Sequence, residues 1–130
     1  MDLSLVIPVK EESETLPELF KEIVAAIEPT GYSFEVIIID DGSRDCTWDV
    51  IEGLSKEYSF VRAFRFQFNC GKAAGLAFGF SKARGKYVAT LDGDLQDDPL
   101  EIPKMIKILE DGYDLVSGWK VRRLDPWHKT

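Results

Sequence analysis

Residues 34–43 read FEVIIIDDGS, an apolar run rich in β-branched side chains that ends in two carboxylates, a glycine and a serine. The continuous apolar segment from Val36 to Ile39 suits a strand that is buried on both faces, as strands of parallel sheets are. Similar runs occur elsewhere in the chain, at residues 3–9, 61–66, 87–91 and 114–117. The sequence therefore predicts five strands.

Segments with helical periodicity separate these runs. The clearest has Thr15 and Glu18 placed as a capping box and an apolar stripe at Leu16, Leu19, Phe20, Ile23, Val24 and Ile27. A second has its apolar positions at Trp48, Ile51, Leu54 and Tyr58, and a third has them at Ala73, Leu76, Ala77 and Phe80 and ends near Gly85.

The fourth predicted helix has clear end signals. Asp98, Pro99 and Glu101 suit the positions N-cap, N1 and N3, and Gly112 suits the end. Its buried stripe is predicted to be Ile102, Met105, Ile106 and Leu109. The order βαβαβαβαβ predicts an α/β fold, a mostly parallel sheet with helices on both faces, because parallel neighbours need crossover connections.

Composition excludes several classes of protein. The 130 residues suit one domain, and 45% apolar residues are enough for a core. The 16 basic and 23 acidic residues give a net charge of −7, so a nucleic acid is not an expected partner. No apolar run approaches the roughly 18 residues that span a bilayer, and no signal peptide is evident, so we expect a cytoplasmic chain. Cys46 and Cys70 lack the spacing of metal ligands, and we expect free thiols.

Polar residues collect directly after the predicted strands. In open α/β sheets, ligands bind outside the carboxyl ends of the strands, so these residues are expected at one edge. They are Lys10, Glu11 and Glu12 after the first strand, Asp40, Asp41, Gly42 and Ser43 after the second, Asn69, Gly71 and Lys72 after the third, and Asp92, Gly93, Asp94 and Gln96 after the fourth.

Asp92-Gly93-Asp94, followed by Gln96, is the sharpest of these motifs. Asp-Gly is also a common hairpin turn, but a capped helix rather than a second strand follows here. Two carboxylates and an amide oxygen suit Mg²⁺ or Mn²⁺, which keeps other coordination positions for water and phosphate.

The other two clusters each allow a structural and a functional interpretation. The stretch from Asp40 to Ser43 suits either a loop in which Asp45 caps the next helix, or carboxylates that accept hydrogen bonds from a base or a ribose. Asn69, Gly71 and Lys72 open a helix, where free N–H groups and a cation suit a phosphate; a surface lysine beside a glycine cap is the alternative.

Several known motifs are absent from the sequence. There is no G-x-G-x-x-G after the first strand, no P-loop around Gly71-Lys72, and no nucleophile motif to pair with His128. A phosphoacceptor receiver domain has a similar length and alternation. Receivers, however, place the phosphorylated Asp after the third strand, where this chain has Gln67, Phe68 and Asn69.

These residues together resemble the first part of a family 2 glycosyltransferase of GT-A, Rossmann-like fold, close to the dolichol-phosphate mannose synthase and polyprenyl-phosphate glycosyltransferase branch. The likeness runs through VIPV (6–9) with Glu12, DDGS (40–43) with Asp45 and Thr47, Asn69 with Gly71-Lys72, DGDLQD (92–97) with Pro99, and Gly118-Trp119. In that branch Tyr and Asn usually stand at the positions of Lys10 and Glu11, and Ala at that of Gly93.

The resemblance implies inverting transfer of a sugar from a UDP- or GDP-sugar to an acceptor, a polyprenyl or dolichyl phosphate, at the cytoplasmic face of a membrane. It assigns Asp92 and Asp94 to catalysis and, with Gln96, to Mg²⁺ or Mn²⁺. The nucleotide-sugar would contact Pro8, Val9, Glu12, Asp40, Asp41, Asn69, Lys72, Asp92 and Gly93. Arg122 and Arg123 are candidates for an acceptor or donor phosphate, with solvated surface residues as the alternative.

The same resemblance suggests two parts. Residues 1–118 would form the nucleotide-sugar-binding domain, and residues 119–130 would begin an acceptor-side segment that is cut short. We therefore expect donor binding without sugar transfer, and membrane contact only through parts outside this chain. A non-catalytic nucleotide-binding module and a receiver-like signalling domain are the alternative functions.

Overall fold

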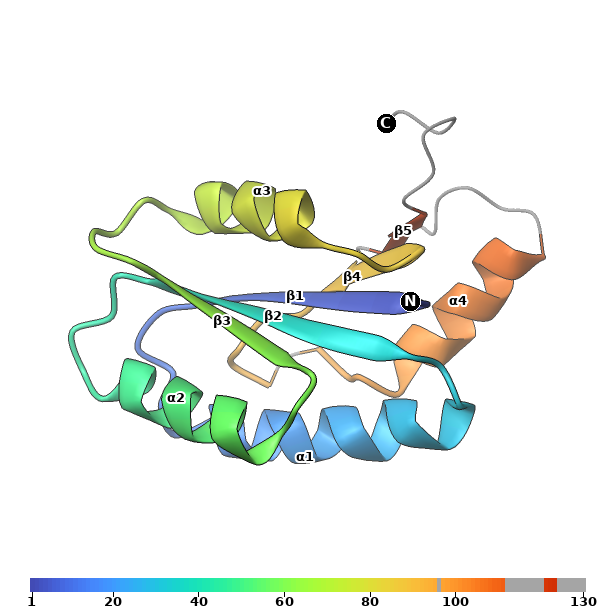
Figure 1. Ribbon diagram of the computed structural model, residues 1–130, viewed down its shortest axis with the longest axis horizontal. Coiled ribbons are helices and arrows are strands. Elements are labelled where there is room, and N and C mark those ends of the chain that lie inside the picture. The colour runs from blue at the N-terminus through green and yellow to red at the C-terminus, as the bar shows by residue number, and fades with distance from the viewer. Residues whose placement is uncertain (96, 112–120, 124–130) are drawn as a thin grey trace.

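The structure is a computed structural model that describes residues 1–95, 97–111 and 121–123. This part forms a five-stranded sheet in the order β3-β2-β1-β4-β5 (Figure 1). Its elements are β1 (Leu3–Val9), α1 (Leu16–Ile27), the 3-10 turn η1 (Glu28–Thr30), β2 (Phe34–Asp41), α2 (Thr47–Glu57), β3 (Val61–Phe66), α3 (Lys72–Lys82), β4 (Tyr87–Thr90), α4 (Glu101–Glu110) and β5 (Val121–Arg123).

The predicted α/β fold is confirmed. Strands β1 to β4 pair in parallel, and β5 runs antiparallel to β4. The chain leaves β1 first toward β2 on one side and later reaches β4 on its other side, so the strand order reverses at β1. Such a switch point is where open α/β sheets bind ligands. The strand predicted at 114–117 lies outside the described residues.

The two faces of the sheet carry cores of different size. Helices α1, α2 and α4 cover the larger one, and α3 alone lies on the other among the described elements (Figure 1). The larger core contains Leu5, Ile7 and Ile38 from the strands, and the smaller one contains Val6 and Ile37. Alternate residues of the central strands therefore pack into the cores on opposite faces of the sheet. This explains why the sequence of these strands is continuously apolar.

Two glycines bring α3 close to the sheet. A Cβ atom at Gly79 would lie 2.3 Å from Val6 Cγ1, and one at Gly75 would lie 3.2 Å from Pro8 Cβ. Larger residues would therefore push the helix outward.

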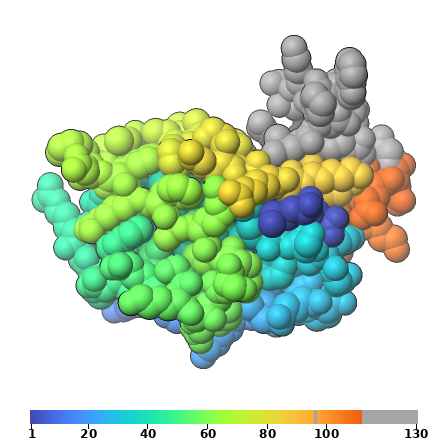
Figure 2. All heavy atoms as spheres, viewed as in Figure 1, coloured from blue at the N-terminus to red at the C-terminus, as the bar shows by residue number. Residues whose placement is uncertain are grey.

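Seen as spheres, the segments from α2 through the edge strand β3 to α3 form a continuous surface, coloured green to yellow (Figure 2).

The predicted capping box at α1 is wrong. Thr15 precedes the helix, but its side chain caps no N–H group. Thr15 Oγ1 instead donates to the carbonyl oxygens of Glu12 and Gly93, and the backbone of Thr15 is helical rather than extended as in a typical N-cap residue. The residue thus joins the start of α1 to the loop after β4.

Helix α4 begins at Glu101, slightly later than predicted. Asp98 Oδ1 still accepts the N–H of Leu100 at 3.0 Å, as an N-cap side chain does, so the difference concerns where regular helix begins. The predicted stripe is buried at Ile102, Ile106 and Leu109, whereas Met105 is half-buried. Gly112 lies outside the described residues.

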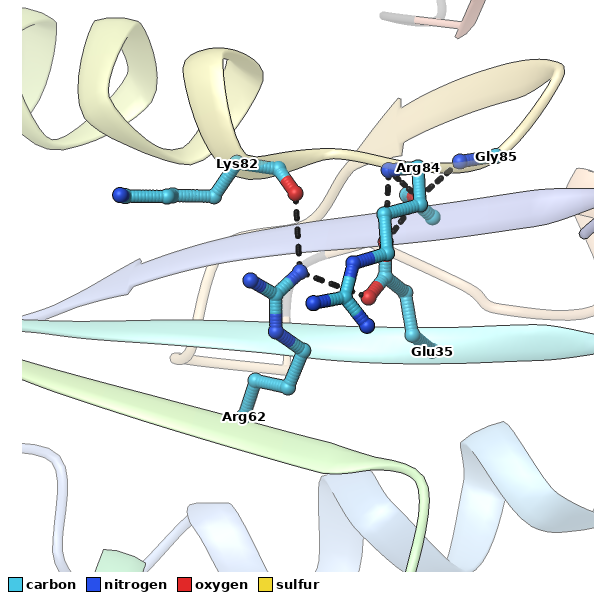
Figure 3. A network of polar contacts seen from close by, with 6 residues as sticks. Glu35, Arg62, Lys82, Arg84 and Gly85 are labelled. Atoms are coloured by element: carbon cyan, nitrogen blue, oxygen red, sulfur yellow. Dashed lines mark hydrogen bonds and ion pairs between the residues drawn. The ribbon is translucent and has the colours of Figure 1, made fainter.

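A buried polar network joins the strands at their amino ends (Figure 3). The Glu35 carboxylate accepts hydrogen bonds from Ser4 Oγ at 2.6 Å, from the Arg84 N–H at 2.8 Å and from Arg62 Nη1 at 2.9 Å. Burial alone would raise the pKa of Glu35, but these bonds outweigh it and hold that pKa below its ordinary value. The network lies at the end of the sheet opposite the predicted site.

None of the described helices is long and apolar enough to cross a membrane. Both cysteines, Cys46 and Cys70, are exposed and free, which confirms the predicted thiols.

Candidate active site

A cleft opens at the carboxyl ends of β1, β2 and β4. Its volume is about 490 Å³. The lining residues come from the last residues of β1 and β2, from the segments that follow β1, β3 and β4, and from the start of α3: Pro8, Val9, Lys10, Glu12, Asp41, Asn69, Gly71, Lys72, Asp92 and Asp94. The topology therefore brings together side chains that lie far apart in the sequence.

The loop after β4 presents Asp92 and Asp94 to this cleft. The loop is held from within, because the Asp92 N–H donates to Asp97 Oδ2 at 3.1 Å. Leu95 has a φ of 68°, a left-handed conformation that bulky residues rarely adopt. Such backbone strain is common at binding and catalytic sites.

Glu12 lies beside this loop. Its Oε1 accepts the Lys10 N–H at 3.3 Å, and its Oε2 is buried with no hydrogen-bond partner. Burial is the main reason why the pKa of Glu12 is raised, and the charges of Asp94 and Asp92 raise it further, against the Lys10 N–H and the Lys72 cation. The cleft thus concentrates negative charge.

Lys72, the first residue of α3, forms an ion pair with Asp92 Oδ1. The pKa of Lys72 is raised, chiefly by this hydrogen bond. Because Lys72 is the first residue of α3, the cation and the helix N-terminus lie on the same side of the cleft. The first turn of a helix also exposes N–H groups, which attract anions.

Asp41 and Asp40 have different roles although they are adjacent. Asp41 accepts the N–H groups of Cys70 at 2.7 Å and Gly71 at 3.0 Å, and so fixes the chain that enters α3. Asp40 is fully buried; one oxygen accepts the Ser43 N–H at 2.9 Å and the other has no partner. Asp41 lines the cleft, whereas Asp40 is not among the lining residues.

The loop after β1 is held by two hydroxyl groups on the β2–α2 segment. Ser43 Oγ accepts the Glu11 N–H at 2.8 Å, and Thr47 Oγ1 accepts the Glu12 N–H at 3.0 Å. Asp45 in turn accepts the Thr47 N–H at 2.9 Å, but Cys46 is the N-cap residue of α2 and no side chain caps that helix, so the predicted cap at Asp45 is wrong. The hydrogen bond instead stabilises the turn that leads into α2.

The donor set of the cleft fits a hard divalent cation. Asp92 and Asp94 offer carboxylate oxygens, and Glu12 Oε2 is a buried acceptor without a partner. No group of three or more His, Cys, Asp or Glu side chains that could hold a metal ion occurs among the described residues. One or two carboxylates are enough to hold Mg²⁺ or Mn²⁺ when water and phosphate oxygens complete the shell.

Most of the predicted site residues meet in this one cleft: Pro8, Val9, Glu12, Asp41, Asn69, Lys72, Asp92 and Asp94. Gly93 is buried against Glu12 and Val9, and Gln96 lies outside the described residues. Arg122 and Arg123 belong to β5, where their backbones pair with Val88 and Tyr87 in the amino half of β4. That these two arginines bind an acceptor or donor phosphate stays a prediction.

Sequence reasoning missed the supports of the site. Thr47 is part of the family resemblance alone, and Gly75 and Gly79 belong to none of the sequence motifs. The i, i+4 spacing of these glycines on the predicted helix was the available signal, because it marks a face that can approach a neighbour closely.

The model of the family described as "Glycosyl transferase family 2" matches residues 4–130. The chain belongs to this family. Family 2 membership confirms the resemblance seen in the sequence, and the strand order and carboxyl-edge cleft agree with it.

Curated relatives of this family 2 chain include two undecaprenyl-phosphate 4-deoxy-4-formamido-L-arabinose transferases. That of Pseudomonas syringae pv. syringae is 40% identical over 95% of the chain and 37% of the relative. That of Serratia proteamaculans is 38% identical over 98% of the chain and 39% of the relative. The chain thus spans less than two fifths of the length of these relatives.

Solved structures of similar fold include S. aureus TarS 1-349 in complex with UDP, with a TM-score of 0.72 and 20% identity over 85% of the chain and 32% of that fragment. The mannosyltransferase PcManGT from Pyrobaculum calidifontis, in complex with GDP-Man and Mn²⁺, has a TM-score of 0.64 and 21% identity over 71% of the chain and 27% of its own length. These likenesses show the GT-A fold.

Proposed function

We propose that this chain is the donor-binding part of an inverting, metal-dependent glycosyltransferase. The donor would be a UDP- or GDP-sugar, and the acceptor of the whole enzyme a polyprenyl phosphate at the cytoplasmic face of a membrane. The names of the curated relatives, which are undecaprenyl-phosphate sugar transferases, support this acceptor class. The UDP and GDP-Man complexes of structural neighbours support a nucleotide-sugar donor.

One observation carries the proposal: the cleft sets a cation at a helix N-terminus against a pair of carboxylates. Lys72 and the start of α3 form one side, and Asp92 and Asp94 form the other. A diphosphate could meet the cation directly but would be repelled by the carboxylates, by about 4 kcal/mol per unit-charge pair at 4 Å and an effective dielectric of 20. A divalent cation between them reverses the sign of that interaction.

The remaining roles follow from position in the cleft. Pro8, Val9, Asp41 and Asn69 would hold the base and ribose, with Asp40 supporting the loop. Asp92 and Asp94, with Gln96, would hold Mg²⁺ or Mn²⁺. When bound, the metal supplies Lewis-acid stabilisation of the departing diphosphate. A phosphate acceptor is already ionised at neutral pH and needs no general base to attack the anomeric carbon.

The alternative functions differ in what they predict. A non-catalytic nucleotide-binding module would use the same cleft but never transfer sugar. A receiver domain is inconsistent with the strand order, since receivers have the order 2-1-3-4-5 whereas β1 here lies between β2 and β4.

Nucleotide binding to this 130-residue chain tests the proposal. Thermal unfolding would be followed with UDP, GDP, CDP and dTDP, each with Mn²⁺ or with EDTA. We expect UDP or GDP to raise the melting temperature only with Mn²⁺, because a ligand that binds only the folded state stabilises it. No shift with any nucleotide, or equal shifts with EDTA, would contradict the proposal. Sugar transfer to a polyprenyl phosphate by a longer protein containing this chain would separate the enzyme from the module.

A further inference from the structure

We propose that Lys72 occupies the place of the metal at Asp92 until the donor arrives, and then exchanges Asp92 for the donor diphosphate. This inference rests on the proposed function and adds a step to it. Lys72 would thus be a positioning residue that keeps the ligand-free cleft in shape and couples metal binding to nucleotide binding.

The contacts of Lys72 support the first half of the exchange. Its Nζ pairs with Asp92 Oδ1, although Asp92 belongs to the loop proposed to bind metal. Asp92 and Asp94 both lie close enough to Glu12 for their charges to act on its carboxylate. In the ligand-free cleft, Lys72 therefore balances a group of carboxylates that would otherwise repel each other.

The structure lets the side chain of Lys72 move while its backbone stays in place. Asp41 holds the N–H groups of Cys70 and Gly71 just before the helix, and Gly75 packs closely on Pro8. By contrast, the side chain of Lys72 is 52% exposed, against 28% for Asp92. The exchange then needs only rotation about side-chain bonds.

Electrostatics supplies the reason for the exchange. An ammonium group and a divalent cation at the same carboxylate repel each other, so metal bound at Asp92 displaces Lys72. A diphosphate bound in the cleft beside α3 would then offer the displaced cation a new anionic partner. A metal ion that binds without nucleotide must therefore compete with Lys72 for Asp92. When nucleotide is also bound, the contact of Lys72 with the diphosphate adds to the affinity of the complex.

The inference predicts effects of opposite sign when the charge of Lys72 is removed. Lys72→Met should strengthen binding of Mn²⁺ alone by about tenfold, since the competing cation is gone. The same change should weaken binding of UDP or GDP in saturating Mn²⁺ by about tenfold, since a charge-assisted contact to phosphate is lost.

The experiment is titration calorimetry on the 130-residue chain and its variants, with Mn²⁺ alone and then with nucleotide in excess Mn²⁺. Lys82→Met is the matched control, because Lys82 is an exposed lysine at the other end of α3 and lies outside the cleft. Lys72→Arg keeps the charge and should leave the affinity for Mn²⁺ alone near that of the unmodified chain.

Opposite changes in Lys72→Met, with both affinities unchanged in Lys82→Met, would support the inference. An unchanged affinity for Mn²⁺ alone, or a fall in both affinities, would overturn it. The proposed function fails separately, if the unmodified chain binds no nucleotide at any Mn²⁺ concentration; the measurement with Mn²⁺ alone still decides whether Lys72 competes with the metal.

Discussion

The carboxylate of Glu12 fills the space that a side chain at position 93 would need. A Cβ atom at Gly93 would lie 2.6 Å from Glu12 Oε2 and 2.8 Å from Val9 Cγ1. The glutamate end could rotate away, but Val9 is a short, branched residue with little freedom. The absence of a side chain at Gly93 therefore lets the loop after β4 close on the loop after β1.

Gly93→Ala should lower the free energy of unfolding by about 1 to 3 kcal/mol, because the added methyl group overpacks this contact. Gly53→Ala is the control. Gly53 is an exposed position of α2, and a Cβ atom there would have no other atom within 4 Å, so alanine should stabilise the helix by about 0.5 to 1 kcal/mol. Urea unfolding of both variants measures the difference. Equal stabilisation by both changes would show that Glu12 and Val9 accommodate the added methyl group without a loss of unfolding free energy.

Asp94→Ala should reduce Mn²⁺-dependent nucleotide affinity at least tenfold, by our estimate for the loss of a carboxylate from the metal site. Stability should change by no more than about 0.5 kcal/mol, because Asp94 is exposed. Asp111→Ala removes the same charge from an exposed position after α4 and should leave affinity unchanged. Calorimetry in Mn²⁺ checks affinity, and thermal unfolding checks the fold. Retained affinity in Asp94→Ala would remove this residue from the proposed metal site.

Glu35→Gln should destabilise the protein by about 2 kcal/mol at neutral pH, because charge-assisted hydrogen bonds in the buried network are weakened. The folded pKa of Glu35 is lowered, so its carboxylate stabilises the fold fully above the ordinary value of 4.5. That stabilisation is lost as the pH falls through the lowered folded pKa.

The difference in unfolding free energy between Glu35→Gln and the unmodified chain should therefore be constant at neutral pH and shrink in acid. Urea unfolding at a series of pH values measures this difference. Glu52→Gln, at an exposed position of α2, should show little difference at any pH. A Glu35 difference that does not depend on pH would mean that the charge of Glu35 contributes nothing.

Glu11→Asn should stabilise the loop after β1 by about 0.5 to 1 kcal/mol, because asparagine tolerates left-handed backbone better than glutamate. Glu11 has a φ of 55°. Glu14→Asn is the matched control, since it makes the same change of charge at a nearby exposed residue without positive φ. Differential scanning calorimetry compares the two. An equal gain in both variants would assign the effect to charge rather than to backbone conformation.

The sequence by itself determined the α/β fold and most of the candidate site. Continuous apolar strands such as Val36 to Ile39, alternating with amphipathic helices, allow few arrangements other than a mostly parallel sheet. In such a sheet the residues after each strand must meet at one edge, so Asp41, Lys72, Asp92 and Asp94 could be placed together without coordinates. The strand order, with β1 central, was not predicted.

Only the tertiary structure decided what each polar side chain contacts. Asp40 and Asp41 are adjacent in sequence and both are buried, yet only Asp41 lines the cleft, because successive residues of a strand face opposite sides of the sheet. The capping box predicted at Thr15 failed because a carbonyl 78 residues away, that of Gly93, lies within reach of the hydroxyl. Pairings such as Lys72 with Asp92 likewise join loops that are distant in the chain, so local sequence patterns could not reveal them.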